Sequence, residues 1–238
     1  MSTLTTLRDV ARMPYKAAAL SPKWKAFLGH VPADEQFSVL LAGPSGTGKS
    51  TLCMQLAKEF SRLGQVLYVC AEERTKTGTL RLRARLLGIS SSRIWLHDTI
   101  AYEEVCSQLA TGRYKFCFFD SIQEMDAQDE KLMQILERFP DVVFVFVAQV
   151  DWTEKQSRGS SKWRHKVDIR LWTEASEEDG CRYATNVKNR FAPSQSKLFL
   201  FCPPTAIPDE QRSTASYDAV KAQLRSRGRS PWKTTSRG

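Results

Sequence analysis

The sequence predicts an α/β fold in which helices cover both faces of a mostly parallel sheet. Short apolar segments, such as residues 142–148, alternate along the chain with segments of helical periodicity. A glycine-rich loop directly follows the first of these apolar segments and precedes a helical one. Strands that are apolar on both faces are typical of sheets buried between helices, so the alternation predicts two helix layers.

The first predicted elements lie on either side of the glycine-rich loop. Residues 1–20 contain no clear strand, and Pro14 would interrupt a helix there. Residues 37–42 predict a buried strand, and residues 49–63 predict a helix with Leu52, Leu56 and Phe60 on one face. The elements that follow are strands at 65–71, 93–96, 114–120 and 142–150, and helices at 79–87, 102–111 and 129–139.

The pattern changes after residue 150. Residues 151–166 are polar, basic and glycine-containing, and a loop of this length in a compact domain is usually functional or disordered. Three further strands are predicted at 169–173, 181–188 and 197–201. Residues 225–238 carry five basic residues and no acidic one, which predicts a disordered tail. The predicted organisation is an arm at 1–20, one domain at 21–205 and a polar, basic tail at 206–238.

Length and composition restrict the class of protein. A chain of 238 residues is long enough for one α/β domain with a substantial core. It has no apolar run of about 18 residues and no signal-peptide pattern, so we expect a protein without membrane contact. The six cysteines lack zinc-site spacing, which predicts plain thiols and a reducing cytoplasm. The net charge of +9 favours a polyanionic partner such as nucleic acid, although a solvated basic surface would give the same charge.

The strongest functional signal is the glycine-rich loop itself. Three glycines allow the backbone N–H groups to turn inward around phosphate oxygens, and the helix that follows adds the positive end of its dipole. Lys49 would reach the β- and γ-phosphates, and the Ser50 hydroxyl would bind Mg²⁺. A chance glycine loop rarely has all eight motif positions between a strand and a helix. The predicted binding site for ATP and Mg²⁺ is therefore Gly43, Pro44, Ser45, Gly46, Thr47, Gly48, Lys49, Ser50 and Thr51.

Polar side chains end three of the predicted strands. Asp120 follows the apolar run 116–119, where a carboxylate beside a phosphate loop can hold the Mg²⁺ shell. Glu72 and Glu73 follow the strand at 65–71, where such a site needs a residue that orients the attacking water, and chemistry alone does not separate the two. Gln149 ends the strand at 142–148 and could contact the γ-phosphate, or simply cap the strand.

Two basic segments are candidates for contacts with other molecules. The loop after Gln149 combines cations, which neutralise phosphates, with aromatic rings, on which bases stack. Its predicted nucleic-acid contacts are Trp152, Lys155, Arg158, Lys162, Trp163 and Arg164, although a solvated loop with tryptophans packed on the domain is the alternative. Lys188 and Arg190 are spaced two residues apart on a predicted strand and therefore share a face. They could reach the γ-phosphate of a neighbouring subunit, or be two surface cations.

Taken together, the motifs resemble the RecA-like P-loop NTPase core, most closely the RadA (Sms) type, with kinship to DnaB-type helicases. The resemblance covers about residues 20–202 and rests on the phosphate loop and on residues 68–73 (YVCAEE), 120–123 (DSIQ), 165–168 and 187–191 (VKNRF). It implies that Glu72 activates the attacking water, that Asp120 belongs to the Mg²⁺ shell and that Gln149 senses the γ-phosphate.

The resemblance also implies an assembly and a partner. We expect a homo-oligomer, a hexameric ring, in which Lys188 and Arg190 complete the site of the next subunit. ATP hydrolysis would then be coupled to binding or movement of single-stranded DNA on the 151–166 loop, in recombination, repair or replication. The tail from Pro203 onward could bind DNA or a protein partner.

Several features depart from the family pattern. RadA-type proteins carry a four-cysteine zinc module and a Lon-protease-like domain, and this sequence contains neither. Gln149 stands where RadA-type cores have a histidine, and Ala192 where a glycine usually follows the KNRF string. The resemblance therefore implies the ATPase mechanism and leaves the biological role open. The alternatives are a KaiC-like regulatory switch acting on a protein partner, a small-molecule kinase, and a DNA-binding adaptor without hydrolysis.

Overall fold

The computed structural model describes residues 5–72, 78–149, 166–192 and 196–201. Within these ranges one sheet of eight strands has the order β3-β2-β4-β5-β1-β6-β7-β8. The first six strands of this order are parallel, and β7 and β8 are antiparallel to their neighbours. The predicted mostly parallel sheet is thus confirmed. The strands are β1 (Ser38–Gly43), β2 (Val66–Cys70), β3 (Ile94–His97), β4 (Phe116–Asp120), β5 (Val143–Gln149), β6 (Ile169–Ala175), β7 (Arg182–Asn189) and β8 (Lys197–Phe201).

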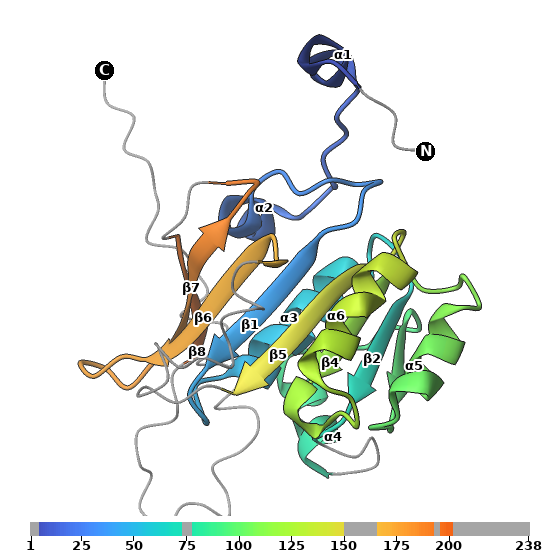
Figure 1. The fold of residues 1–238 in the computed structure, drawn as a ribbon. Helices are drawn as coiled ribbons and strands as arrows, with labels where there is room; N and C mark the ends of the chain where they lie inside the picture. The colour runs from blue at the N-terminus through green and yellow to red at the C-terminus, as the bar shows by residue number, and fades with distance from the viewer. Residues whose placement is uncertain (1–4, 73–77, 150–165, 193–195, 202–238) are drawn as a thin grey trace, which may run out of the picture.

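Helices cover both faces of this sheet (Figure 1). Apolar side chains of α2, α3 and α4 pack with one set of strand residues, and those of α5 and α6 pack with the alternate set. Leu41 and Leu40, adjacent in β1, belong to opposite clusters because successive side chains of a strand point to opposite faces. The helices are α1 (Leu7–Arg12), α2 (Pro22–Leu28), α3 (Lys49–Phe60), α4 (Gly78–Leu86), α5 (Tyr102–Leu109) and α6 (Asp129–Arg138), with a 3₁₀ turn η1 (Ile122–Glu124) after β4.

Aromatic side chains fix the central strands. Phe119 and Phe146 stack between β4 and β5 with ring centroids 5.5 Å apart, and Phe60 of α3 stacks on Phe116 at 4.8 Å. These rings are buried, and each contributes roughly 1.5–3 kcal/mol to stability through removal of apolar surface from water. The ends of β4 and β5 therefore stand on a rigid, close-packed base.

Helix α2 lies in a segment to which the sequence analysis assigned no element. Pro22 occupies its first turn, Gly29 ends it with φ 77°, and Trp24, Phe27 and Leu28 are buried. These are ordinary start and stop signals, and they were overlooked because the helix has only seven residues.

Helix α1 is the part of the described chain that stands away from the sheet and its helix layers (Figure 1). It ends at Arg12, before Pro14, and has no buried residue. Leu7, Val10 and Met13 are therefore exposed apolar side chains on the arm.

The cysteines differ in part from the expectation of plain thiols. Cys53, Cys70, Cys106 and Cys117 are free and buried, as predicted. Cys181 is disulfide-bonded, so the prediction is wrong at this position.

None of the helices in the described part of the chain has the length and apolarity needed to cross a bilayer.

Candidate functional site

The glycine-rich loop connects β1 to α3 at the carboxyl ends of the parallel strands, an edge of the sheet that we call the loop edge. Gly46 and Gly48 have φ of 72° and 93°, a region that residues with a Cβ seldom adopt. Gly48 is the N-cap of α3, so the first turn of this helix, whose leading N–H groups have no acceptor within the helix itself, begins at the loop edge. This backbone is suited to bind an anion such as a phosphate group.

Lys49 and Ser50 begin α3 and place two functional groups beside the loop. The Lys49 ammonium donates to the carbonyl oxygens of Gly43 at 2.9 Å and Pro44 at 2.8 Å. The Ser50 hydroxyl donates to Oδ1 of Asp120 at 3.4 Å, because α3 lies across β4 on the sheet. Lys49, the predicted phosphate-binding residue, therefore lies beside the two predicted metal ligands, Ser50 and Asp120.

Asp120 is the buried carboxylate of the site, with only 7% of its surface exposed. Its Oδ2 accepts a hydrogen bond of 2.6 Å from the hydroxyl of Tyr68 in β2. Burial, and then the charge of Asp120, raise the pKa of Tyr68 well above its ordinary value, so the phenol remains a donor. A carboxylate and a hydroxyl oxygen are ligands that suit a hard cation, and Asp120 and Ser50 thus fit Mg²⁺.

Glu72 and Gln149 lie at the same edge. The backbone N–H of Glu72 donates to the carbonyl oxygen of Asp120 at 3.1 Å, and its side chain is exposed. Gln149 pairs with Gly43 in the β1–β5 register, and its carbonyl oxygen accepts a 3.1 Å bond from the Gln123 side chain. Four strand ends thus bring the predicted catalytic and metal-binding residues to one edge. Glu73, the alternative to Glu72, lies outside the described residues.

Two side chains that the sequence analysis did not single out support the loop from β6 and β7. The hydroxyls of Thr47 and Thr173 are 2.7 Å apart, and Arg182 donates from Nε to the carbonyl oxygen of Gly46 at 3.0 Å. Arg182 also donates to the carbonyl of Gly180 in the β6–β7 turn. Thr173 is 126 positions from Thr47 in the sequence, so only the strand order reveals that they meet.

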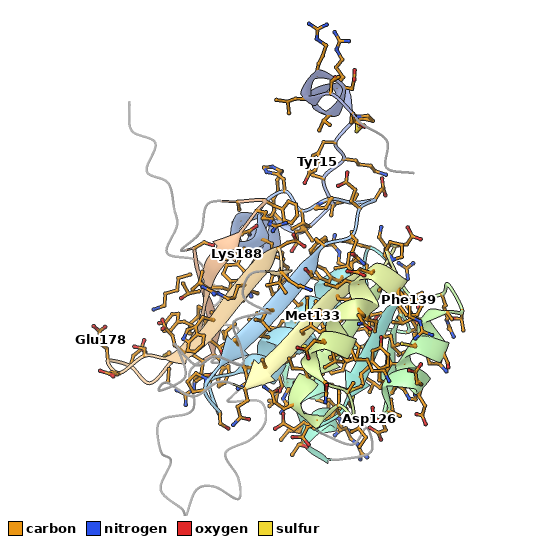
Figure 2. The ribbon with its side chains drawn as sticks, viewed as in Figure 1. Tyr15, Asp126, Met133, Phe139, Glu178 and Lys188 are labelled. Atoms are coloured by element: carbon orange, nitrogen blue, oxygen red, sulfur yellow. The ribbon has the colours of Figure 1, made fainter. Side chains whose placement is uncertain are left out.

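Lys188 and Arg190 lie at the opposite edge of the sheet, where β1 and β6 begin. Lys188 donates to the carbonyl of Val167, and Arg190 forms a 2.9 Å ion pair with Asp168 while its side chain remains 58% exposed. Burial, and then the charge of Arg190, lower the pKa of Lys188. Figure 2 shows Lys188 and Glu178 toward opposite ends of the β6–β7 hairpin. The pair is therefore not part of the phosphate site of its own chain.

The six predicted nucleic-acid contacts lie outside the described residues. The segment that carries them is joined at its start to Gln149, and hence to the loop edge.

Comparison with protein families and curated proteins gives two findings. The AAA domain family model matches residues 9–150. The DNA repair protein RadA of Chlamydia muridarum is 30% identical over 175 residues, which cover 68% of this chain and 38% of RadA. The RadA of Streptococcus pneumoniae is 29% identical over 176 residues, covering 68% of this chain and 41% of that protein. The chain thus spans about two fifths of the length of these relatives.

Solved structures with the same architecture extend this comparison. The KaiC-like protein PH0186 from Pyrococcus horikoshii OT3 aligns with a TM-score of 0.60 at 20% identity, over 77% of this chain and 94% of that one. The RadB recombinase aligns with a TM-score of 0.56 at 18% identity, over 75% and 92%. At these identities the likeness shows the shared RecA-like fold.

Proposed function

The chain belongs to the AAA domain family, with a RecA-like core close to RadA, and from this premise we propose that it is a homo-oligomeric ATPase that acts on single-stranded DNA. One observation carries the proposal. Lys49, Ser50, Asp120, Glu72 and Gln149 come from four separate segments, and the fold gathers them at one edge beside a loop built for phosphate. The named relatives, DNA repair proteins and a recombinase, support DNA as the partner.

Each residue at the loop edge has a task in hydrolysis. The N–H groups of the loop and the Lys49 ammonium hold the phosphates of ATP in place. Ser50 and Asp120 would hold Mg²⁺, which neutralises charge on the phosphate oxygens. Glu72 orients the attacking water and accepts its proton, and Gln149 contacts the γ-phosphate. The water reaches Glu72 from solvent because that side chain is exposed.

Assembly is supported by two surfaces at a distance from the loop edge. Arg190 is largely exposed at the opposite edge, so it can meet the phosphate site of another subunit. Apolar side chains on α1 are exposed within the described part of the chain, and a second copy would cover them. A head-to-tail contact of this kind repeats and closes into a ring when the rotation permits.

A mixing experiment tests the shared site. Lys49→Ala removes the phosphate-binding ammonium from a subunit's own site. Arg190→Ala removes the guanidinium that the subunit would supply to the site of the next subunit. We expect each variant to be inactive alone and an equal mixture to regain about a quarter of the parent rate, because one interface in four then holds both residues. Steady-state ATP hydrolysis measures this, and a mixture with no activity above the separate variants contradicts a shared site.

Stimulation by DNA tests the partner. We expect single-stranded DNA to raise the rate of ATP hydrolysis, and Lys49→Ala to abolish hydrolysis with and without DNA. The increase should be smaller at high salt, because DNA binding by basic side chains releases counterions from the phosphates and is therefore weakened by added salt. The 151–166 loop, with its tryptophans and cations, and the net charge of +9 motivate this expectation. Hydrolysis that is indifferent to DNA at either salt concentration would instead favour a regulatory switch acting on a protein.

A further inference from the structure

The hydroxyl of Tyr68 is a polar group inside an otherwise apolar strand. Tyr68 is 2% exposed, and its neighbours along β2 belong to the core. In the β2–β4 register Tyr68 pairs with Phe118 and Cys70 pairs with Asp120, so the tyrosine side chain reaches two residues toward the loop edge. It ends at Asp120 Oδ2, 2.6 Å away.

The aromatic ring of Tyr68 is fixed by a stacking contact with a neighbouring ring of the core. Phe118 stacks on Tyr68 with ring centroids 5.7 Å apart and planes 10° apart, and both rings belong to the cluster under α3. A side chain confined in this way has little freedom to follow a moving partner. The hydroxyl position is therefore set by the core, and the carboxylate aligns to it.

The two oxygens of Asp120 are directed to different groups. Oδ2 accepts from the buried phenol, and Oδ1 faces the Ser50 hydroxyl at 3.4 Å. A hydrogen bond donated by a fixed group to one carboxylate oxygen restricts the rotamer of the carboxylate and thereby the direction of the other oxygen. The arrangement resembles the outer shell of metal sites, in which a second residue orients the one that binds the metal.

We propose that Tyr68 is a positioning residue for the metal-binding carboxylate: its hydroxyl holds Oδ2 of Asp120 and so turns Oδ1 toward Ser50. The inference rests on the proposed function, because it takes Asp120 and Ser50 as the Mg²⁺ ligands. Tyr68 lies in the core, where its hydroxyl also meets the Cys53 thiol of α3, and its proposed effect on the metal is exerted through Asp120.

The test is Tyr68→Phe, which removes one oxygen atom and keeps the stacked ring. Tyr183→Phe is the matched control, because the Tyr183 hydroxyl also donates to an aspartate, Asp179, at 3.1 Å, but in the exposed β6–β7 hairpin. The affinity for Mn²⁺ with ADP bound is measured by electron paramagnetic resonance, and ADP affinity is measured separately with EDTA present. We expect the Mn²⁺ dissociation constant to rise about 10- to 100-fold in Tyr68→Phe. Metal-free ADP affinity, and both affinities in Tyr183→Phe, stay at the parent values.

A double-mutant cycle separates positioning from a general structural role. In an Asp120→Asn background Tyr68→Phe should have no further effect on Mn²⁺ affinity, since the tyrosine acts through the carboxylate. Additive losses, or a parallel fall in metal-free ADP affinity, would show that the phenol supports the loop as a whole. Circular dichroism spectra and melting curves of each variant establish that the fold is retained.

The results also distinguish this inference from the proposed function. A parent that hydrolyses ATP, with a Tyr68→Phe variant that binds Mn²⁺ equally well, overturns the role of Tyr68 alone. A parent whose Mn²⁺ affinity falls in Tyr68→Phe as expected, but which does not hydrolyse ATP, overturns the ATPase proposal alone. A parent that binds no Mn²⁺ with ADP overturns both.

Discussion

Glu72→Gln is expected to lower the rate of ATP hydrolysis by about 100- to 10,000-fold, the usual contribution of a general base. The amide has nearly the shape of the carboxylate but cannot accept the proton of the attacking water. The backbone N–H of Glu72 donates to Asp120 in the variant as in the parent, and the substitution changes neither Lys49, Ser50 nor Asp120. We therefore expect nucleotide affinity to remain within about twofold of the parent, a change in the catalytic constant rather than in binding. Single-turnover hydrolysis and titration with a fluorescent nucleotide measure the two quantities.

Glu73→Gln is the matched control for this substitution. The two glutamates are adjacent and have the same chemistry, so chemistry alone leaves the choice between them open, and the family resemblance favours Glu72. We expect Glu73→Gln to hydrolyse ATP at close to the parent rate. If the large loss of hydrolysis rate appears in Glu73→Gln and not in Glu72→Gln, the assignment of Glu72 as the general base is wrong, and the proposed ATP site at the loop edge is unaffected. Parent activity in both variants would place the base elsewhere.

Gly43→Ala is expected to lower the free energy of unfolding by about 3 kcal/mol or more, and the melting temperature by about 6–12 °C. A Cβ at this position would lie 2.4 Å from Oγ1 of Thr173 and 2.5 Å from its carbonyl oxygen, with φ at 154°. The backbone of Thr173 cannot move aside as the end of a flexible side chain could. The added methyl group would therefore force β1 and β6 apart. The phosphate loop begins at this residue, and we expect ATP binding to weaken together with stability.

Gly78→Ala is the control for the effect of an added methyl group. Gly78 is the first residue of α4, and a Cβ there would meet no atom within 4 Å. Alanine favours helix, so stability should change by no more than about 1 kcal/mol, in the favourable direction. Thermal melting of both variants is the measurement, and a Gly43→Ala protein as stable as the parent would refute the steric argument.

The sequence was sufficient to predict the parts of the fold and site that depend on local pattern. Apolar runs predicted β1, β2, β4 and β5 within one or two residues, because strands buried on both faces have no polar positions to blur their ends. The glycines, Lys49 and Ser50 are contiguous, so their motif could be found without knowing the fold. Asp120 and Gln149 could be predicted at the same edge because parallel strands end together.

Contacts between distant segments could not be predicted in the same way. The supports from Thr173 and Arg182 depend on β6 lying beside β1, and the partner of Arg190, Asp168, depends on β7 folding back along β6. Tyr68 left a signal that was not used: a tyrosine within an apolar strand requires a partner for its hydroxyl. Its identity followed only from the register of β2 on β4.

The β6–β7 hairpin has one end beside the phosphate loop, at Arg182, and the other beside the exposed Arg190. At about 3.4 Å per residue, the eight residues of β7 span roughly 27 Å. Paired strands resist stretching, so we expect a shift of Gly46 to move the far end of the hairpin as well. In a ring whose subunits share sites, each hairpin would connect the nucleotide site of its own subunit rigidly to the site of the next subunit. Movement of the hairpins would then set the order in which successive subunits hydrolyse ATP. Such coupling between sites would appear as a Hill coefficient above one when the hydrolysis rate is measured against ATP concentration.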